Sequence, residues 1–139
     1  MKRINIFIFS LVLIFTLGCK KGTGGGGPTP PPPPQEESLN ISIDPDPGSG
    51  IAPSLGSTYT FKLNIISKVP AQGVDINVDC KKEIDNSTVS AQSVSSISPQ
   101  TPFSVSGLTP GVSCVVTVRV QSKTLSTNTA TKTFKVVMK

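Results

Sequence analysis

Apolar and polar residues alternate along much of this chain from residue 39 onward. The clearest alternation spans 74–81, where one parity is apolar (Val74, Ile76, Val78, Cys80) and the other is polar (Asp75, Asn77, Asp79, Lys81). A period of two is typical of a β-strand with one buried face and one face in water. Seven such runs are predicted as strands, at 39–43, 59–65, 74–81, 88–94, 101–105, 112–121 and 131–138. No stretch carries apolar residues at helical spacing, so residues 39–139 are predicted to be all β.

Turn signals separate these runs. After the first run, Asp44-Pro45-Asp46-Pro47-Gly48 ends the strand, because proline has no N–H to donate to a neighbouring strand. Residues 39–139 are within the usual size of one domain. Seven short strands with turns between them favour a sandwich of two sheets.

One local motif sharpens this expectation. The segment Gly107-Leu108-Thr109-Pro110-Gly111-Val112-Ser113-Cys114-Val115-Val116-Thr117-Val118 resembles the turn into the sixth strand of fibronectin type III and related immunoglobulin-like domains. The resemblance implies a seven-stranded β-sandwich of that class. Those domains usually carry a tyrosine where Cys114 stands, and this chain departs from the pattern there.

The first eighteen residues have the composition of an export signal. Lys2 and Arg3 precede an apolar run at 6–17 that is interrupted only by Ser10 and Thr16. As a helix this run would be roughly 18 Å long, whereas the hydrocarbon layer of a membrane is ~30 Å thick. The leader is therefore predicted to direct export and not to span the membrane.

The leader ends in Leu17-Gly18-Cys19, which resembles the lipobox of bacterial lipoproteins. The resemblance implies transfer of diacylglycerol to the Cys19 thiol, cleavage between Gly18 and Cys19, and acylation of the new amine by a fatty acid such as palmitate. A thiol is the side chain nucleophilic enough for this transfer near neutral pH. The family prefers leucine three residues before the cysteine and a small residue two before, where this chain has Thr16 and Leu17. Alternatives are an uncleaved anchor and a free secreted chain.

Residues 19–38 contain almost no apolar side chain. Glycines at 22 and 24–27 predict a flexible segment, and prolines at 28 and 30–34 favour a stiff polyproline II rod. The segment is expected to be a disordered tether that holds the following domain up to about 60 Å from the bilayer, at ~3.3 Å per residue. The prolines could alternatively be a ligand for an aromatic groove.

Cys80 and Cys114 fall in phase with the apolar residues of their strands, so both are expected to face the core. With Cys19 lipidated, they remain an even pair in an oxidising envelope, and we expect a disulfide between them. Closing this loop should stabilise the fold by roughly 3–4 kcal/mol. The alternative is two free, buried thiols.

Charge and residue inventory limit the possible functions. Removal of 1–18 takes away Lys2 and Arg3, which leaves eleven basic against eight acidic residues and a net charge of +3. This modest charge and an envelope location argue against nucleic acid as a partner. The chain has no histidine, which excludes histidine-based triads. Asp75 and Asp79 would lie roughly 13 Å apart along one strand, too far for a glycosidase pair.

No catalytic, cofactor-binding or metal-binding residue is predicted, and the protein is not expected to be an enzyme. Asp44 and Asp46 are assigned to turn formation and not to a calcium site.

Function is expected at loops, since a sandwich leaves its sheet ends open for recognition. The candidates are 86–100 and 121–128, although neither carries an aromatic anchor. The favoured function is a membrane-anchored envelope lipoprotein, expected as a monomer, that displays a non-catalytic binding or adhesion module for a protein or polysaccharide. The alternative is an accessory lipoprotein that docks onto a larger complex, for example by sheet-edge pairing. Lys20 after the lipobox implies the outer membrane in preference to the inner one, by family analogy.

Overall fold

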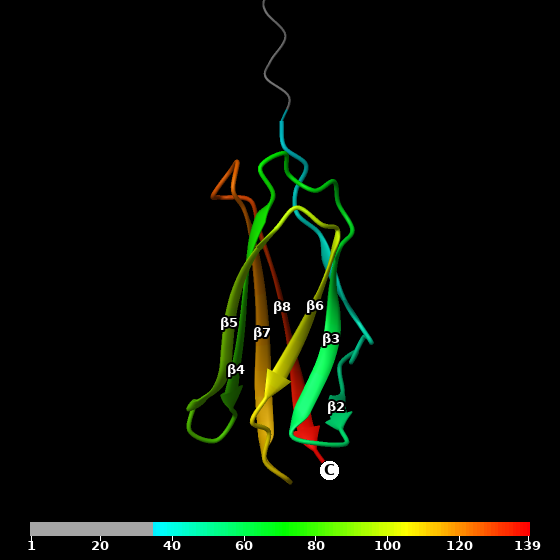
Figure 1. Cartoon of the computed structure of the whole chain (residues 1–139), viewed down its shortest axis with the longest axis vertical. Helices are drawn as coiled ribbons and strands as arrows, with labels where there is room; N and C mark the ends of the chain where they lie inside the picture. Colours follow the sequence, from blue (N-terminus) through cyan, green and yellow to red (C-terminus); the bar gives the residue numbers. More distant parts are fainter. Residues whose placement is uncertain (1–34) are drawn as a thin grey trace, which may run out of the picture. The chain divides into compact units, whose positions relative to one another are not determined.

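The computed structural model describes residues 35–139, and the leader, the cleavage site, Cys19 and most of the tether lie outside the described residues. The described residues form eight strands in two sheets (Figure 1). The smaller sheet has the order β1 (Ile41–Asp44), β3 (Thr58–Ile65) and β6 (Gln100–Ser106). The larger sheet has the order β2 (Ile51–Ser54), β8 (Thr129–Met138), β7 (Ser113–Ser122), β4 (Val74–Lys82) and β5 (Thr88–Ser96). The all-β, two-sheet prediction is confirmed.

The expected number of seven strands is wrong by one. The additional strand, β2, has only four residues, includes Pro53, and pairs parallel with the end of β8, whereas the other pairs of named strands in 35–139 are antiparallel. A four-residue segment with a proline gives too weak a periodic signal to be recognised from sequence. The strand is possible because it lies at the sheet edge, where a missing N–H donor is tolerated.

Apolar and polar side chains alternate along most of the strands, and the two sheets pack with their apolar faces against each other. Val74, Ile76 and Val78 of β4 are 0–1 % exposed, and the alternate positions of β7 are buried in the same way. Four aromatic rings pack together between the sheets. Within the smaller sheet, the ring centroid of Phe61 lies 5.8 Å from that of Phe103 and 6.2 Å from that of Tyr59. Phe61 also packs edge to face on Phe134 of β8, in the larger sheet, with the ring centroids 5.4 Å apart. Every aromatic residue of 35–139 is therefore part of the core.

Residues 36–39 are held to the rest of the domain by the side chain of one asparagine. Asn128, in the turn between β7 and β8, accepts a hydrogen bond from the Leu39 N–H at 2.8 Å. Its Nδ2 donates to the Glu36 carboxylate at 2.6 Å and to the Glu37 carbonyl at 2.8 Å. One asparagine side chain therefore fixes the beginning of the domain.

Candidate functional site

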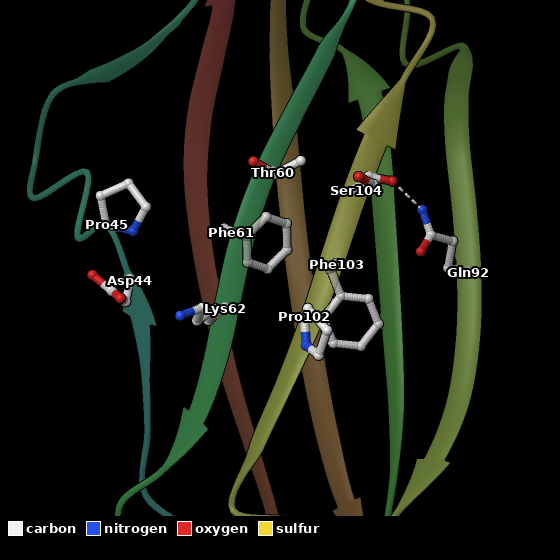
Figure 2. A pocket seen from close by; sticks show the side chains of 9 residues that line it. All are labelled: Asp44, Pro45, Thr60, Phe61, Lys62, Gln92, Pro102, Phe103 and Ser104. Atoms are coloured by element: carbon white, nitrogen blue, oxygen red, sulfur yellow. Dashed lines mark hydrogen bonds between the residues drawn. The ribbon is translucent and has the colours of Figure 1, made fainter.

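Residues 35–139 form an open pocket of about 560 Å³ on the outer side of the smaller sheet (Figure 2). It is lined by Asp44, Pro45, Thr60, Phe61, Lys62, Gln92, Pro102, Phe103 and Ser104. Phe61 and Phe103 belong to the core and are 3 % and 4 % exposed. The other residues reach the pocket from β1, β3, β5 and β6, so it exists only in the folded domain.

The register of the strands explains why these polar side chains gather. Lys62 of β3 lies between Asp44 of β1 and Pro102 of β6, and in the next outward-facing row Thr60 lies opposite Ser104. Outward-facing residues of neighbouring strands lie about 5 Å apart, so each row forms a continuous strip. Gln92 comes from the other sheet, and its Nε2 donates a hydrogen bond to the Ser104 carbonyl, which closes one side of the pocket (Figure 2).

This lining offers one carboxylate, one ammonium group, hydroxyl groups and a side-chain amide, with two proline rings as apolar walls. Such a set can exchange hydrogen bonds with a ligand that carries many hydroxyl groups. The ion pairs among residues 35–139 are elsewhere: they join Lys123 to Asp75 and Lys135 to Glu83. Asp44 and Lys62 therefore remain available for a ligand. Sequence reasoning missed this pocket, because the alternation at 59–65 marks Thr60 and Lys62 as outward-facing but does not reveal their neighbours.

Cys80 and Cys114 both lie in the core, as predicted, and are 0 % and 1 % exposed. Both are free thiols, on neighbouring strands of the same sheet. Cys80 lies opposite Val116 and Cys114 opposite Lys82, which makes the two cysteines diagonal neighbours. Burial raises the pKa of the Cys80 thiol to about 12, and the charge and hydrogen bonding of the Cys114 side chain add to the rise. A thiol with this pKa is protonated at neutral pH and so is a poor nucleophile.

The two segments expected to bind a ligand differ in structure. The strand predicted at 88–94 is confirmed as β5, the edge strand of the larger sheet, so most of 86–100 is strand and not an open loop. The turn after β7 is held by its own hydrogen bonds: the Ser122 hydroxyl accepts from the N–H groups of Thr124 at 3.0 Å and Leu125 at 3.1 Å, and Gln121 Nε2 donates to the Ser126 carbonyl at 2.8 Å. Residues 123–128 therefore form a loop between β7 and β8, as expected, whereas 86–100 is mostly strand.

Several acidic residues have structural partners. The Asp46 carboxylate accepts the Gly48 N–H at 2.9 Å, which is turn chemistry. On the outer face of β4, Asp75 accepts a hydrogen bond from the Ser95 hydroxyl and lies 3.8 Å from the Lys123 ammonium group.

Two acidic pKa values are shifted in the connection between β4 and β5. The hydrogen bond from Lys135 lowers the pKa of Glu83, and those from the Ser87 hydroxyl and N–H lower the pKa of Asp85. Both groups are exposed and stabilise local structure, so neither shift indicates a reactive group.

Two further features of residues 35–139 bear on chemistry. No group of three or more cysteine, aspartate or glutamate residues in this part of the chain could hold a metal ion. None of these residues lies in a helix long and apolar enough to cross a membrane.

No model of a protein family and no curated protein sequence matches this chain.

Proposed function

We propose that this chain is a bacterial envelope lipoprotein, anchored through lipid on Cys19, whose β-sandwich is a non-catalytic binding module. The anchoring rests on the leader and on Leu17-Gly18-Cys19. The binding role rests on one observation, the open pocket on the outer side of the smaller sheet that Asp44, Lys62 and Gln92 help to line. The ligand that best fits its hydroxyl, amide and charged groups is a polysaccharide.

We assign the sandwich to the immunoglobulin and fibronectin type III-like class, with β2 as an additional edge strand. The turn that carries Leu108 supports this assignment: Leu108 is 4 % exposed, and the residues after it lead directly into β7. A buried leucine in this turn, followed by a strand with a buried face, is what the resemblance of 107–118 implies. The cysteine at 114 remains the departure from the pattern.

The alternative is an accessory lipoprotein that docks onto a larger complex inside the envelope. The open sheets of the sandwich favour this alternative, because unpaired strand edges can receive a strand of another protein. The two functions differ in where the domain is found, at the cell surface or inside the envelope.

If lipid is attached to Cys19, fatty-acid labelling and membrane association should both depend on the Cys19 sulfur. Cells given a clickable fatty acid should label the full chain. Cys19→Ala should lose both the label and membrane association, because Cys80 and Cys114 lie far from the proposed cleavage site after Gly18. Cys80→Ala is the matched control and should keep the label. An unlabelled parent chain, or label retained in Cys19→Ala, contradicts the anchor.

Protease treatment of intact cells distinguishes the two proposed functions. A domain displayed at the cell surface is removed, whereas a domain inside the envelope survives until the outer membrane is opened.

If the pocket binds the ligand, the NMR signals that change on binding should belong to residues that line it. Polysaccharide isolated from the producing cell's envelope should perturb the NMR signals of Thr60, Lys62 and Ser104, and Lys62→Ala should weaken binding at least tenfold, because a charge-assisted hydrogen bond contributes about 1.5–3 kcal/mol. Lys132→Ala is the control, since Lys132 is an equally exposed lysine of the other sheet. Perturbations confined to the loops, or equal effects of the two alanine variants, would assign binding elsewhere.

A further inference from the structure

The two sheets are open and therefore have four edges, formed by β1, β6, β2 and β5. Proteins protect such edges from pairing with other chains by proline, charge or short length. Three of the edges are protected here: β2 contains Pro53, β6 contains Pro102, and β1 has four residues and runs directly into Pro45. β5 differs from all three. It has nine residues, with no proline and no charged side chain, and Figure 1 shows it at the margin of the sandwich.

Hydrogen-bond parity shows which backbone groups of β5 face outward. Lys123 N–H donates to the Gly73 carbonyl at 3.1 Å and Glu83 N–H to the Ser113 carbonyl at 2.9 Å, so the odd-numbered residues of β4 bond to β7. Backbone groups alternate sides along an antiparallel strand, and the even-numbered residues of β4 therefore bond to β5. Through the register, these partners are Ser90, Gln92, Val94 and Ser96.

The N–H and C=O groups of Ala91, Ser93 and Ser95 consequently point away from β4. No backbone hydrogen bond within 35–139 engages them outside the paired strands, and β5 pairs only with β4 there. The three side chains are exposed, as is Val94, at 40 %. β5 thus offers six unpaired backbone groups in a row, flanked by side chains too small to obstruct a neighbouring strand.

We propose that β5 pairs antiparallel with β5 of a second copy of this chain, about a two-fold axis at Ser93. In this register Ser93 lies opposite Ser93 of the second copy, and Ala91 lies opposite Ser95. All six outward groups of each copy are then used, in six backbone hydrogen bonds; a shift of two residues would use fewer of them. The five-stranded sheets of the two copies would thereby join into one sheet of ten strands.

Charge favours a second copy as the partner. An isologous contact brings residues near the two-fold axis close to their own counterparts, so a charged side chain there would face a like charge. Residues 86–100 contain no charged side chain, although acidic and basic residues lie just outside this range on β4. Pairing also places Val94 beside Gln92 of the second copy, which covers an exposed apolar side chain. The dimer replaces the monomer expected from sequence.

Antiparallel pairing has a consequence for the proposed anchor. The domain begins beside Asn128 at one end of the sandwich, so the two starting points lie at opposite ends of the ten-stranded sheet. Such a dimer is suited to joining two facing surfaces. This consequence rests on the proposed function, whereas the pairing itself does not.

Cross-linking tests the pairing directly, on the full chain as it accumulates in cells. Ser93→Cys should form a disulfide-linked dimer on mild oxidation, because directly opposed strand residues have Cα atoms about 5.5 Å apart, within disulfide range. Thr131→Cys is the matched control: it is exposed on the same sheet but lies away from the β5 edge, and it should yield no dimer, as should the parent chain. Cross-linking of Ser93→Cys to a different protein, or equal dimer yields from both variants, would overturn the proposal.

A charge at the axis provides a second readout. Ser93→Lys should weaken dimerisation at least tenfold in sedimentation measurements, because two lysines would face each other, while the thermal unfolding of the monomer should stay unchanged. Thr131→Lys adds the same charge to the same sheet and should leave the dimer intact. A parent chain that sediments as a monomer at high micromolar concentration contradicts the proposal, as does a dimer that Ser93→Lys does not weaken.

Discussion

Phe61→Ala is expected to lower the free energy of unfolding by about 3–5 kcal/mol, the usual cost of removing a buried ring from a core. Phe61 is 3 % exposed and contacts the rings of Tyr59, Phe103 and Phe134. Because Phe134 belongs to the larger sheet, the substitution removes the centre of the contact that holds the two sheets together. Small domains are stable by only about 5–15 kcal/mol, so the loss would be a large share of the total.

Chemical denaturation of the parent and variant chains measures this effect. Thr60→Ala is the matched control, since Thr60 precedes Phe61 on the same strand but faces water, and its change should stay within about 0.5 kcal/mol. A loss below about 1 kcal/mol in Phe61→Ala would mean that the neighbouring rings close the cavity, and that the aromatic cluster does not hold the sheets together.

The second large effect concerns Cys80 and Cys114, for which we propose a disulfide in the protein isolated from an oxidising envelope. The bond should stabilise the domain by about 3–4 kcal/mol relative to its reduced form. Diagonal strand neighbours lie about 7–8 Å apart, whereas a disulfide joins Cα atoms about 4.4–6.8 Å apart. Formation of the bond therefore requires a local shift of Cys80 and Cys114 toward each other along their paired strands, and the resulting strain would reduce the gain.

Alkylation and unfolding measurements distinguish the two redox forms. The disulfide form, denatured without reductant, should take up no alkylating group at these residues, and reductant should lower its unfolding midpoint. The Cys80→Ala/Cys114→Ala double variant should not respond to reductant. Uptake of two groups by the denatured chain without reductant would show that the thiols are free in the isolated protein.

The pH dependence of stability gives an independent readout. In the reduced form, Cys80 has a native pKa of about 12 against an ordinary value of 9.0. Above pH 9 the unfolded chain loses a proton that the native protein retains, so stability should be full below pH 9 and fall as the pH rises toward 12, by up to ~1.4 kcal/mol per pH unit. Tyr59, whose pKa burial also raises, adds to this fall. A disulfide does not titrate, so the cysteine contribution should be missing from the oxidised form.

The alternation of residues predicted much of the fold correctly. The run at 74–81 corresponds to β4, and its apolar parity is the buried one. The runs at 59–65 and 112–121 correspond to β3 and β7 with the same success. The period of two works here because each of these strands has one face in the core and one in water, so that burial alone imposes the pattern.

Features that depend on strand neighbours could not be predicted in this way. The strand predicted at 88–94 is confirmed as β5, but its place at the edge of the larger sheet could not be predicted from its own residues. β2 was missed because four residues with a proline gain their order from pairing with β8 and not from local preference. The pocket was missed because Asp44 and Lys62, eighteen positions apart, meet only through the pairing of β1 with β3.

By itself, the sequence determined which faces of the strands are buried and that both Cys80 and Cys114 enter the core. Only the tertiary structure decided which strands are neighbours, and therefore that the cysteines are diagonal partners within one sheet, that a polar pocket lies across β3 and β6, and that β5 has a free edge. The physical reason is that side-chain alternation records burial, which each strand carries in its own residues, whereas strand order depends on the packing of the two sheets as a whole.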